Sequence, residues 1–290
     1  ITNAGTTTPV FTITGVDADN YEITNVDNQV SVTIMPKPVT VIQSGTYVYS
    51  GVAQAITLKV EGRVGDDDIK ATTTNIKNAG TTTPIFTISG TAVSNYQITN
   101  VGNRVSVTIQ PKPTSVSQSG TYTYDGTAQT ITLKIDDIVV GDDIEATIDN
   151  ITNAGSYTPI FTISGSDKNN YVITNSENKV AVTINQKQVS VIQSGTYTYD
   201  GTAQTIALVV DGRCGDDDIV ATIAKITNAG TTTPVFTISG ADAGNYEITN
   251  VDNQVSVTIN KAVLTVSQNM ASVPTYTGSL ETYYLTAVGF

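Results

Sequence analysis

The chain has 290 residues, a formal net charge of −12 and no histidine. This acidity disfavours nucleic acid and anionic lipid as partners. The absence of histidine excludes Ser-His-Asp and Cys-His catalytic arrangements. A single cysteine, Cys214, allows no disulfide within the chain. No run approaches the roughly 20 apolar residues of a membrane helix, so we expect no membrane insertion in this segment.

A 75-residue period organises the whole sequence. The motif Ile-x-Asn-Ala-Gly begins at Ile1, Ile76, Ile151 and Ile226, without insertion or deletion between copies. Such a period is typical of repeat arrays. We place complete repeats at 36–110, 111–185 and 186–260, and partial repeats at 1–35 and 261–290. Because residue 1 falls inside a repeat, we expect a fragment whose targeting and anchoring segments lie elsewhere.

The predicted elements are strands, because apolar and small polar residues alternate with a period of two. The first pattern covers Val10–Ile13 and predicts a core phenylalanine at Phe11, Phe86, Phe161 and Phe236. The next covers 30–34, with copies at 105–109, 180–184 and 255–259. We expect the valines of these copies to share one buried face and Thr33 to face water.

Prolines and tyrosines follow in chain order. Pro36-Lys37-Pro38 and Pro111-Lys112-Pro113 predict short stiff connectors between repeats. The tyrosine pairs Tyr47/Tyr49, Tyr122/Tyr124 and Tyr197/Tyr199 are each two residues apart, and therefore on one strand face. Aromatic faces suit sugar or protein contacts, but core edges and cross-strand pairs are the commoner use.

Turn signals recur every 8–12 residues and separate some seven strands in each repeat. The predicted fold is therefore all-β, a linear array of immunoglobulin-like β-sandwiches. A β-grasp-like module is the competing fold. It is disfavoured because no helical pattern is present.

Acidic loops provide the best local signal for a metal. Clustered carboxylates on a loop are a natural start for calcium, which takes six to eight oxygen ligands. The flanking residues change between copies, however, and no Asp-x-Asp-x-Asp-Gly spacing occurs. We therefore interpret these loops as solvated turns and expect no metal or other cofactor. The weak calcium candidates are Asp66, Asp67, Asp68, Asp142, Asp143, Asp216, Asp217 and Asp218.

Other reactive arrangements receive little support from the sequence. A Lys–Asn isopeptide bond would need a strand lysine in every copy, but Lys59 and Lys134 correspond to Val209. Cys214 stands where the first complete repeat has Val64, which indicates a small, half-apolar role. No phosphate-binding glycine loop and no marked carboxylate pair appears. We expect no enzyme activity.

Each repeat carries a shared series of motifs. It begins with Lys-x-x-x-(Ser/Thr)-Val and continues with a Tyr-(Asp/Ser)-Gly turn, as at Tyr124-Asp125-Gly126. Asn-Ala-Gly, Phe-Thr-Ile-Ser-Gly, Asn-Tyr-x-Ile and Val-Thr-Ile then follow, with small changes between copies. This series resembles the MBG/YDG-type repeats of large bacterial surface and secreted adhesin-like proteins. The segment 261–290, with Lys261–Val266 and Val288-Gly289-Phe290, resembles the related second MBG type.

The resemblance implies an extracellular, bacterial cell-surface location and repeat-stalk architecture, and it supplies no catalytic residues. The leading hypothesis is a structural stalk or spacer that projects an unseen tip domain, through which host or matrix glycan or protein would be bound. One alternative is a repeat array that binds glycan or protein ligands by avidity. Another is a fibre subunit that associates head to tail, because the partial repeats 1–35 and 261–290 hold complementary strands.

Overall fold

A computed structural model of the chain describes residues 1–268, 276–280 and 285–288. The described residues form short β-strands and eight 3-10 helices of three residues each, without an α-helix. The predicted all-β class is therefore confirmed. A β-grasp-like module needs a helix across its sheet, and the described residues contain none that could serve. Gly289 and Phe290, part of the motif that resembles the second MBG type, lie outside the described residues.

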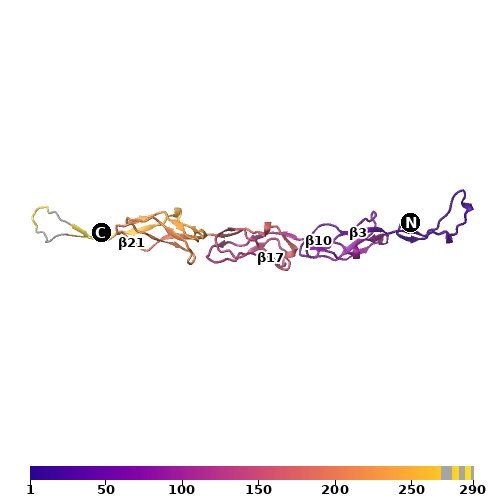
Figure 1. Cartoon of the computed structure of the whole chain (residues 1–290), viewed down its shortest axis with the longest axis horizontal. Coiled ribbons are helices and arrows are strands. Elements are labelled where there is room, and N and C mark those ends of the chain that lie inside the picture. Colours follow the sequence, from indigo (N-terminus) through magenta and orange to yellow (C-terminus); the bar gives the residue numbers. More distant parts are fainter. Residues whose placement is uncertain (269–275, 281–284, 289–290) are drawn as a thin grey trace. The chain divides into compact units, whose positions relative to one another are not determined.

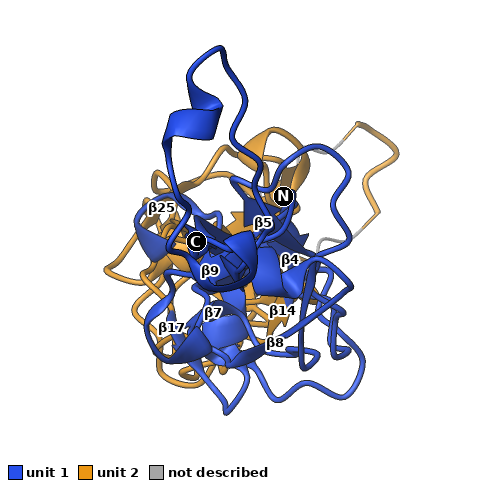
Figure 2. Ribbon diagram, turned by 90° about the vertical axis from the view of Figure 1, so that its right-hand side faces the viewer, with its two compact units in different colours: residues 1–116, 135–146, 162–178 blue, residues 117–134, 147–161, 179–290 orange. Residues whose placement is uncertain are grey.

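Two compact units make up the chain (Figure 2). Unit 1 comprises 1–116, 135–146 and 162–178; unit 2 comprises 117–134, 147–161 and 179–290. The first complete repeat lies in unit 1 and the third in unit 2, whereas the second contributes residues to both. The units are therefore described separately below.

The first complete repeat contains eight strands, one more than the sequence suggested. They are β3 (Lys37–Gln43), β4 (Tyr47–Val48), β5 (Leu58–Glu61), β6 (Lys70–Thr73), β7 (Gly80–Thr82), β8 (Phe86–Ser89), β9 (Tyr96–Ile98) and β10 (Val107–Gln110). Three sheets result, with strand orders β5-β3-β9, β4-β10-β7 and β6-β8. The pairs β3–β9 and β4–β10 are parallel, and the remaining pairs are antiparallel.

Much of the core of this repeat comes from β3 and β10. Both strands are labelled in Figure 1. Val39 and Val41 point inward from β3, while Val107 and Ile109 point inward from β10. The alternation seen in the sequence produces this arrangement, because every second side chain of a strand faces the same side. Phe86 is buried among them at 1 % exposure, as predicted.

The third repeat, in unit 2, has the same sheets. Its strands are β20 (Lys187–Ser194), β21 (Tyr197–Thr198), β22 (Ala207–Asp211), β23 (Val220–Thr222), β24 (Gly230–Thr232), β25 (Thr237–Ser239), β26 (Tyr246–Ile248) and β27 (Val257–Asn260). Their orders are β22-β20-β26, β21-β27-β24 and β23-β25. Val255 and Val257 are buried and Thr258 is exposed, so the predicted register of 255–259 is confirmed.

The second repeat follows the same plan within each unit. Its strands are β11 (Lys112–Thr114), β12 (Val116–Gln118), β13 (Tyr122–Thr123), β14 (Leu133–Ile135), β15 (Glu145–Thr147), β16 (Gly155–Tyr157), β17 (Thr162–Ser164), β18 (Tyr171–Ile173) and β19 (Val182–Asn185). In unit 1, β11 pairs in parallel with β18. In unit 2, β19 pairs in parallel with β13 and antiparallel with β16.

Pairs of 3-10 helices flank the segment that begins with the Asn-Tyr tyrosine, which is a strand in the three complete repeats. They are η1 (Ala18–Asn20), η2 (Val26–Asn28), η3 (Val93–Asn95), η4 (Val101–Asn103), η5 (Lys168–Asn170), η6 (Ser176–Asn178), η7 (Ala243–Asn245) and η8 (Val251–Asn253). The helices η3, η5 and η7 each end at the asparagine before that tyrosine. This position sets the direction of both side chains in the candidate site below.

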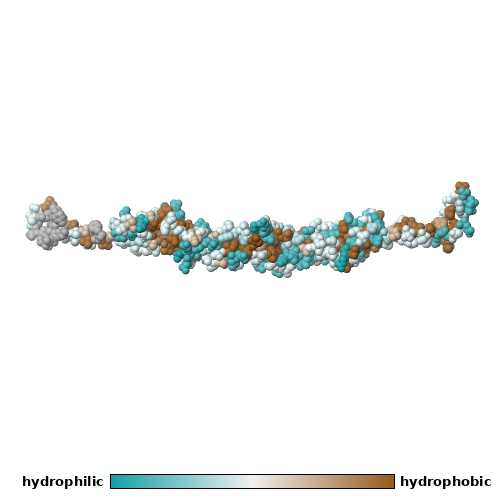
Figure 3. All heavy atoms as spheres, in the orientation of Figure 1, coloured by the Kyte–Doolittle hydropathy of each residue, from teal (hydrophilic) through white to brown (hydrophobic). Residues whose placement is uncertain are grey.

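The terminal segments are short two-stranded sheets. In the first, β1 (Gly5–Thr7) pairs with β2 (Val32–Ile34), and in the last, β28 (Thr265–Gln268) pairs with β29 (Leu285–Val288). Apolar residues lie at the surface of the N-terminal segment (Figure 3). Val30, predicted to be buried, is 43 % exposed, and Phe11 is only half-buried. The residues 1–35 lack the strands that cover these positions in a complete repeat.

The predicted connectors are shorter than expected. Lys37 and Pro38 already belong to β3, where they pair with Tyr96 and Gln97 of β9. A proline is tolerated there because it lies in the first residues of the strand, where its missing N–H removes at most one ladder bond. The strand of the next repeat therefore begins almost directly after the preceding β2.

Candidate functional site

Two tyrosines from different repeats meet at one aspartate in unit 1. Tyr49, just after β4, donates its hydroxyl to Asp142 Oδ2 at 2.8 Å, and Tyr171 of β18 donates to the same oxygen at 2.6 Å. The Tyr171 oxygen also accepts a hydrogen bond from the Val139 backbone N–H at 2.8 Å. The two rings pack edge to face, with centroids 5.6 Å apart. We call this arrangement the tyrosine joint.

The same joint occurs in unit 2. Tyr124 donates to Asp217 Oδ2 at 2.7 Å, Tyr246 donates to that oxygen too, and the Cys214 N–H donates to the Tyr246 hydroxyl at 2.8 Å. Again the rings are edge to face, at 5.4 Å. Edge-to-face pairs contribute roughly 0.5–1.5 kcal/mol and hydrogen bonds to charged groups roughly 1.5–3 kcal/mol. Each joint is therefore a specific contact between successive repeats.

A glycine lets the backbone approach each joint. Gly51 has φ +79°, and a Cβ there would lie 2.3 Å from Cγ1 of Val139. Gly126 has φ +83°, and a Cβ there would lie 3.0 Å from Cβ of Cys214. Both glycines end the Tyr-x-Gly turn, so this motif supplies a hydroxyl donor and a surface without a side chain.

Asparagines form a second contact between the same repeats. Asn170 accepts a hydrogen bond from the Ala79 N–H at 2.9 Å, and Asn245 accepts one from the Ala154 N–H at 2.9 Å. Asn170 and Asn245 are almost fully buried. In each pair, the alanine belongs to the Asn-Ala-Gly turn of the preceding repeat. Two recurrent motifs of one repeat thus dock on the Asn-Tyr motif of the next.

The electrostatics of the joint follow from its burial. Burial and the hydrogen bond to Asp217 raise the pKa of Tyr124 to about 12. Burial and the hydrogen bond to Asp142 raise the pKa of Tyr171 to about 12. The hydroxyls of Tyr246 and then Tyr124 hold the pKa of Asp217 below its usual range. At neutral pH the tyrosines are neutral donors, an arrangement that holds two repeats together rather than one that generates a nucleophile.

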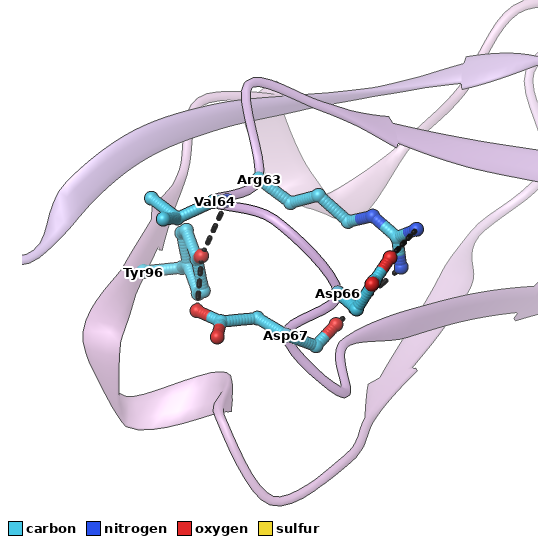
Figure 4. Close-up of polar contacts among 5 residues, drawn as sticks. All are labelled: Arg63, Val64, Asp66, Asp67 and Tyr96. Atoms are coloured by element: carbon cyan, nitrogen blue, oxygen red, sulfur yellow. Dashed lines mark hydrogen bonds and ion pairs between the residues drawn. The ribbon is translucent and has the colours of Figure 1, made fainter.

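The remaining loop carboxylates point elsewhere. Asp68, Asp143 and Asp218 accept hydrogen bonds from the backbone N–H groups of Thr91, Ser166 and Ala241. Asp66 is exposed and faces Arg63, as Figure 4 shows, and Asp216 is exposed as well. In the part of the chain that the structure describes, no three His, Cys, Asp or Glu side chains are placed to hold a metal ion. The weak calcium candidates are therefore divided among different roles.

Cys214 and Lys59 occupy ordinary surroundings. Cys214 is half-buried at the joint, and Lys187 Nζ lies 3.2 Å from its sulfur. This position fits the small, half-apolar role suggested by the sequence. Lys59 is largely exposed, and its Nζ pairs with Glu61 Oε1 at 3.3 Å.

Sequence reasoning missed the other half of the joint. Tyr96, Tyr171 and Tyr246, together with the preceding asparagines, appeared only as markers of the repeat. The available signal was that the acidic loop, the Tyr-x-Gly turn and the Asn-Tyr pair recur together. What the sequence did not contain is the pairing of these motifs across repeats.

Within the described residues, no helix has the length and apolar character needed to cross a membrane. No protein-family model matches the chain, and no curated protein matches it. Among solved structures, the chain is similar to FdeC, described as a broadly conserved Escherichia coli adhesin. The identity is 10 %, the match covers 76 % of this chain and 96 % of that one, and the TM-score is 0.21. A similarity this low carries no argument about fold or function.

Proposed function

We propose that the chain is a stalk or spacer region of a bacterial cell-surface, adhesin-like protein, in which tyrosine joints fix each repeat to the next. The joint is the observation that supports this most directly. Its donors, acceptor, ring geometry and glycine recur in both units with the same sequence separations. A spacer needs such repeated contacts, because flexible hinges between repeats would shorten the distance that the spacer spans.

The burial of the tyrosines favours a spacer over a ligand-binding array. A binding array should expose an aromatic groove at the same place in every repeat. Instead Tyr49 and Tyr124 are 2 % and 4 % exposed, and Tyr47, Tyr122 and Tyr197 are half-buried. Tyr199, the counterpart of Tyr49 and Tyr124 in the third repeat, is 41 % exposed. Tyr49 and Tyr124 are therefore used between repeats.

The surface location rests on the sequence resemblance to MBG/YDG-type repeats. A tip domain that binds host or matrix glycan or protein belongs to the same proposal. Protease treatment of intact cells that produce the natural protein tests the location. The repeats should be cleaved while cytoplasmic proteins stay intact. Full protection of the repeats on intact cells would reject a surface role.

Loss of a joint should loosen two repeats, and spin labels can measure this. We would place labels at positions 87 and 176, both exposed and both in unit 1, in a Cys214→Ser background. The distance distribution should be narrow in the parent and clearly broader in Asp142→Ala. Asp66→Ala is the matched control, because Asp66 is an exposed loop acid outside any joint. Equal distributions in the parent and in Asp142→Ala would contradict the spacer proposal.

A further inference from the structure

The second complete repeat contains a surface hollow whose lining differs from the matching surface of the other repeats. The hollow has a volume of about 570 Å³ and lies in unit 2, between the segment 149–153 and the end of β16. Tyr157, the last residue of β16, lines it together with Asp149 and Asn150. Its volume falls within the range of roughly 300–1,000 Å³ that is typical of ligand pockets.

Two of the lining residues depart from the repeat pattern. The other copies have threonine at the position of Tyr157, namely Thr7, Thr82 and Thr232. The other complete repeats have Thr74 and Ala224 at the position of Asp149. The first and third repeats form the same sheets without a tyrosine or an aspartate at these positions. The fold therefore does not require either residue, yet both occur in one repeat and line one hollow.

The Tyr157 ring is held against the backbone beside the hollow. Its hydroxyl donates to the carbonyl oxygen of Asn153 at 2.9 Å. A Cβ at Gly155 would lie 3.4 Å from Cζ of the ring, whereas a Cβ at Gly80 or Gly230 would meet no atom within 4 Å. Tyr157 is only half-buried, so part of the ring stays accessible. A ring fixed in this way can receive the flat apolar face of a ligand at little cost in side-chain ordering.

Asp149 and Asn150 add hydrogen-bonding groups to the same hollow. Both residues are exposed, and within the described part of the chain neither side chain has a hydrogen-bond partner. A carboxylate accepts hydrogen bonds, and an amide both accepts and donates them. A pyranose sugar combines an apolar C–H face with hydroxyl groups that donate and accept. The hollow therefore offers an aromatic surface for the first and polar partners for the second.

We propose that this hollow binds a neutral pyranose sugar. One face of the sugar ring stacks on Tyr157, and its hydroxyl groups bond with Asp149 and Asn150. An acidic sugar is disfavoured, because its carboxylate would meet Asp149 on a chain whose net charge is −12. The site occurs in one of the three complete repeats, so it adds a single ligand contact to a spacer and does not make the chain a binding array.

Nuclear magnetic resonance of the purified 290-residue chain tests the proposal. The probes are the methyl glycosides of glucose, galactose, mannose and N-acetylglucosamine. At least one of them should shift the ring signals of Tyr157 in tyrosine-labelled protein, with a dissociation constant on the order of 1 mM. The methyl glycoside of the uronic acid with the same ring configuration should bind more weakly.

Tyr157→Thr is the main variant, because it introduces the residue of the other copies and should fold as they do. It should weaken binding about tenfold, measured at the backbone amide of Asn150. Asp149→Ala, which introduces the residue of the third repeat, should weaken binding as well. Thr82→Ala is the matched control, since it changes the corresponding position of the first repeat and should bind like the parent. The thermal midpoint of each variant checks that it folds.

The absence of a Tyr157 shift with all four sugars would overturn the proposal. Equal affinity in the parent and in a folded Tyr157→Thr variant would do so too, as would a loss of binding in Thr82→Ala as large as in Tyr157→Thr. The tyrosines and aspartate of the joint in unit 2, Tyr124, Tyr246 and Asp217, do not line the hollow. A failure of sugar binding would therefore leave the spacer function standing, and the spin-label distances would decide that function separately.

Discussion

Gly51 and Gly201 occupy the same position in two repeats, but only Gly51 faces another repeat. Their φ angles are +79° and +80°. A Cβ at Gly51 would meet Val139, whereas a Cβ at Gly201 would meet no atom within 4 Å. Both positions favour glycine because of their positive φ, but only Gly51 also needs to lack a side chain so that Val139 can pack against it.

Alanine at each position should measure that difference. Gly201→Ala should cost about 1 kcal/mol of unfolding free energy, because a residue with a Cβ is strained at positive φ. Gly51→Ala should cost clearly more, because Val139 must move away from the joint. Denaturant unfolding provides the measurement, and adding Val139→Ala to Gly51→Ala should recover part of the excess. Equal losses at positions 51 and 201 would show that Val139 accommodates the methyl group.

The protonation states of the joint predict a pH range for its stability. Tyr124 has a folded pKa of about 12, above its unfolded value near 10. Its stabilisation is therefore complete below about pH 10 and is lost as the pH rises toward 12. Asp217 has a depressed pKa, so its stabilisation is present above its unfolded pKa of about 4 and is lost as the pH falls.

A thermal midpoint measured against pH should therefore decline at both ends of this range. Tyrosinate absorbance should follow the alkaline decline, with Tyr124 ionising at a higher pH than its unfolded pKa near 10. The double variant Tyr124→Phe/Tyr246→Phe is the control, since it should lose the part of the alkaline decline that belongs to this joint. Ionisation of all tyrosines near pH 10 in the folded parent would contradict the assigned burial.

At the scale of the element, the strands were predictable and their partners were not. Alternation placed Val105, Val107 and Ile109 on a buried face because side-chain direction depends only on the local backbone. The same alternation does not indicate which strand pairs with which neighbour. The parallel pairs β3–β9 and β4–β10 join residues about 60 positions apart, and no local feature encodes them.

In the candidate site too, the local sequence of the acidic loops does not indicate which residues they contact. Their sequence predicted solvated turns, and Asp66 and Asp216 are exposed. Asp142 and Asp217 instead serve as acceptors for tyrosines about 90 positions away in the chain. A carboxylate that binds a tyrosine and one that faces water look alike in a sequence. Only the contact between repeats distinguishes them.

These loop contacts also give a reason for the expectation about calcium. Asp67 and Asp68 are engaged with Tyr96, Thr91 and Lys70, so their oxygens do not converge on one point. A chelator should therefore leave the thermal midpoint of the chain unchanged. Added calcium should also leave the thermal midpoint unchanged. Calcium would raise the midpoint only if it bound to the folded state. A rise of several degrees with calcium would show that the loops rearrange around a metal.

At the scale of the whole molecule, each tyrosine joint lies within one of the two units. The second repeat is split: residues 135–146 and 162–178 belong to unit 1, and 117–134 and 147–161 belong to unit 2. The part in unit 1 carries Asp142 and Tyr171, which meet Tyr49 of the first repeat. The part in unit 2 carries Tyr124, which meets Asp217 of the third. Each piece is grouped with the repeat to which its joint binds it.

Because both joints use equivalent residues, removal of one complete repeat should rebuild a joint. Deleting 111–185 removes one 75-residue period and brings Tyr49 to the same sequence separation from Asp217 that it has from Asp142. Tyr49 should then share Asp217 with Tyr246, Gly51 should face Cys214, and Ala79 should donate to Asn245. The thermal midpoint should stay close to that of the parent. Hydrogen exchange should protect the amide of Cys214, which donates to Tyr246 in the parent.

A deletion of 111–180 is the matched control, because it leaves five extra residues between the repeats and puts the motifs out of phase. The Tyr49 turn then cannot reach Asp217 with the geometry of the parent joint, so protection at Cys214 should fall and the two repeats should unfold independently. Equal protection and equal midpoints in the two deletions would mean that each repeat is stable by itself and that the joints contribute nothing measurable. A difference between them would establish that the 75-residue period is set by the joint as well as by the sandwich.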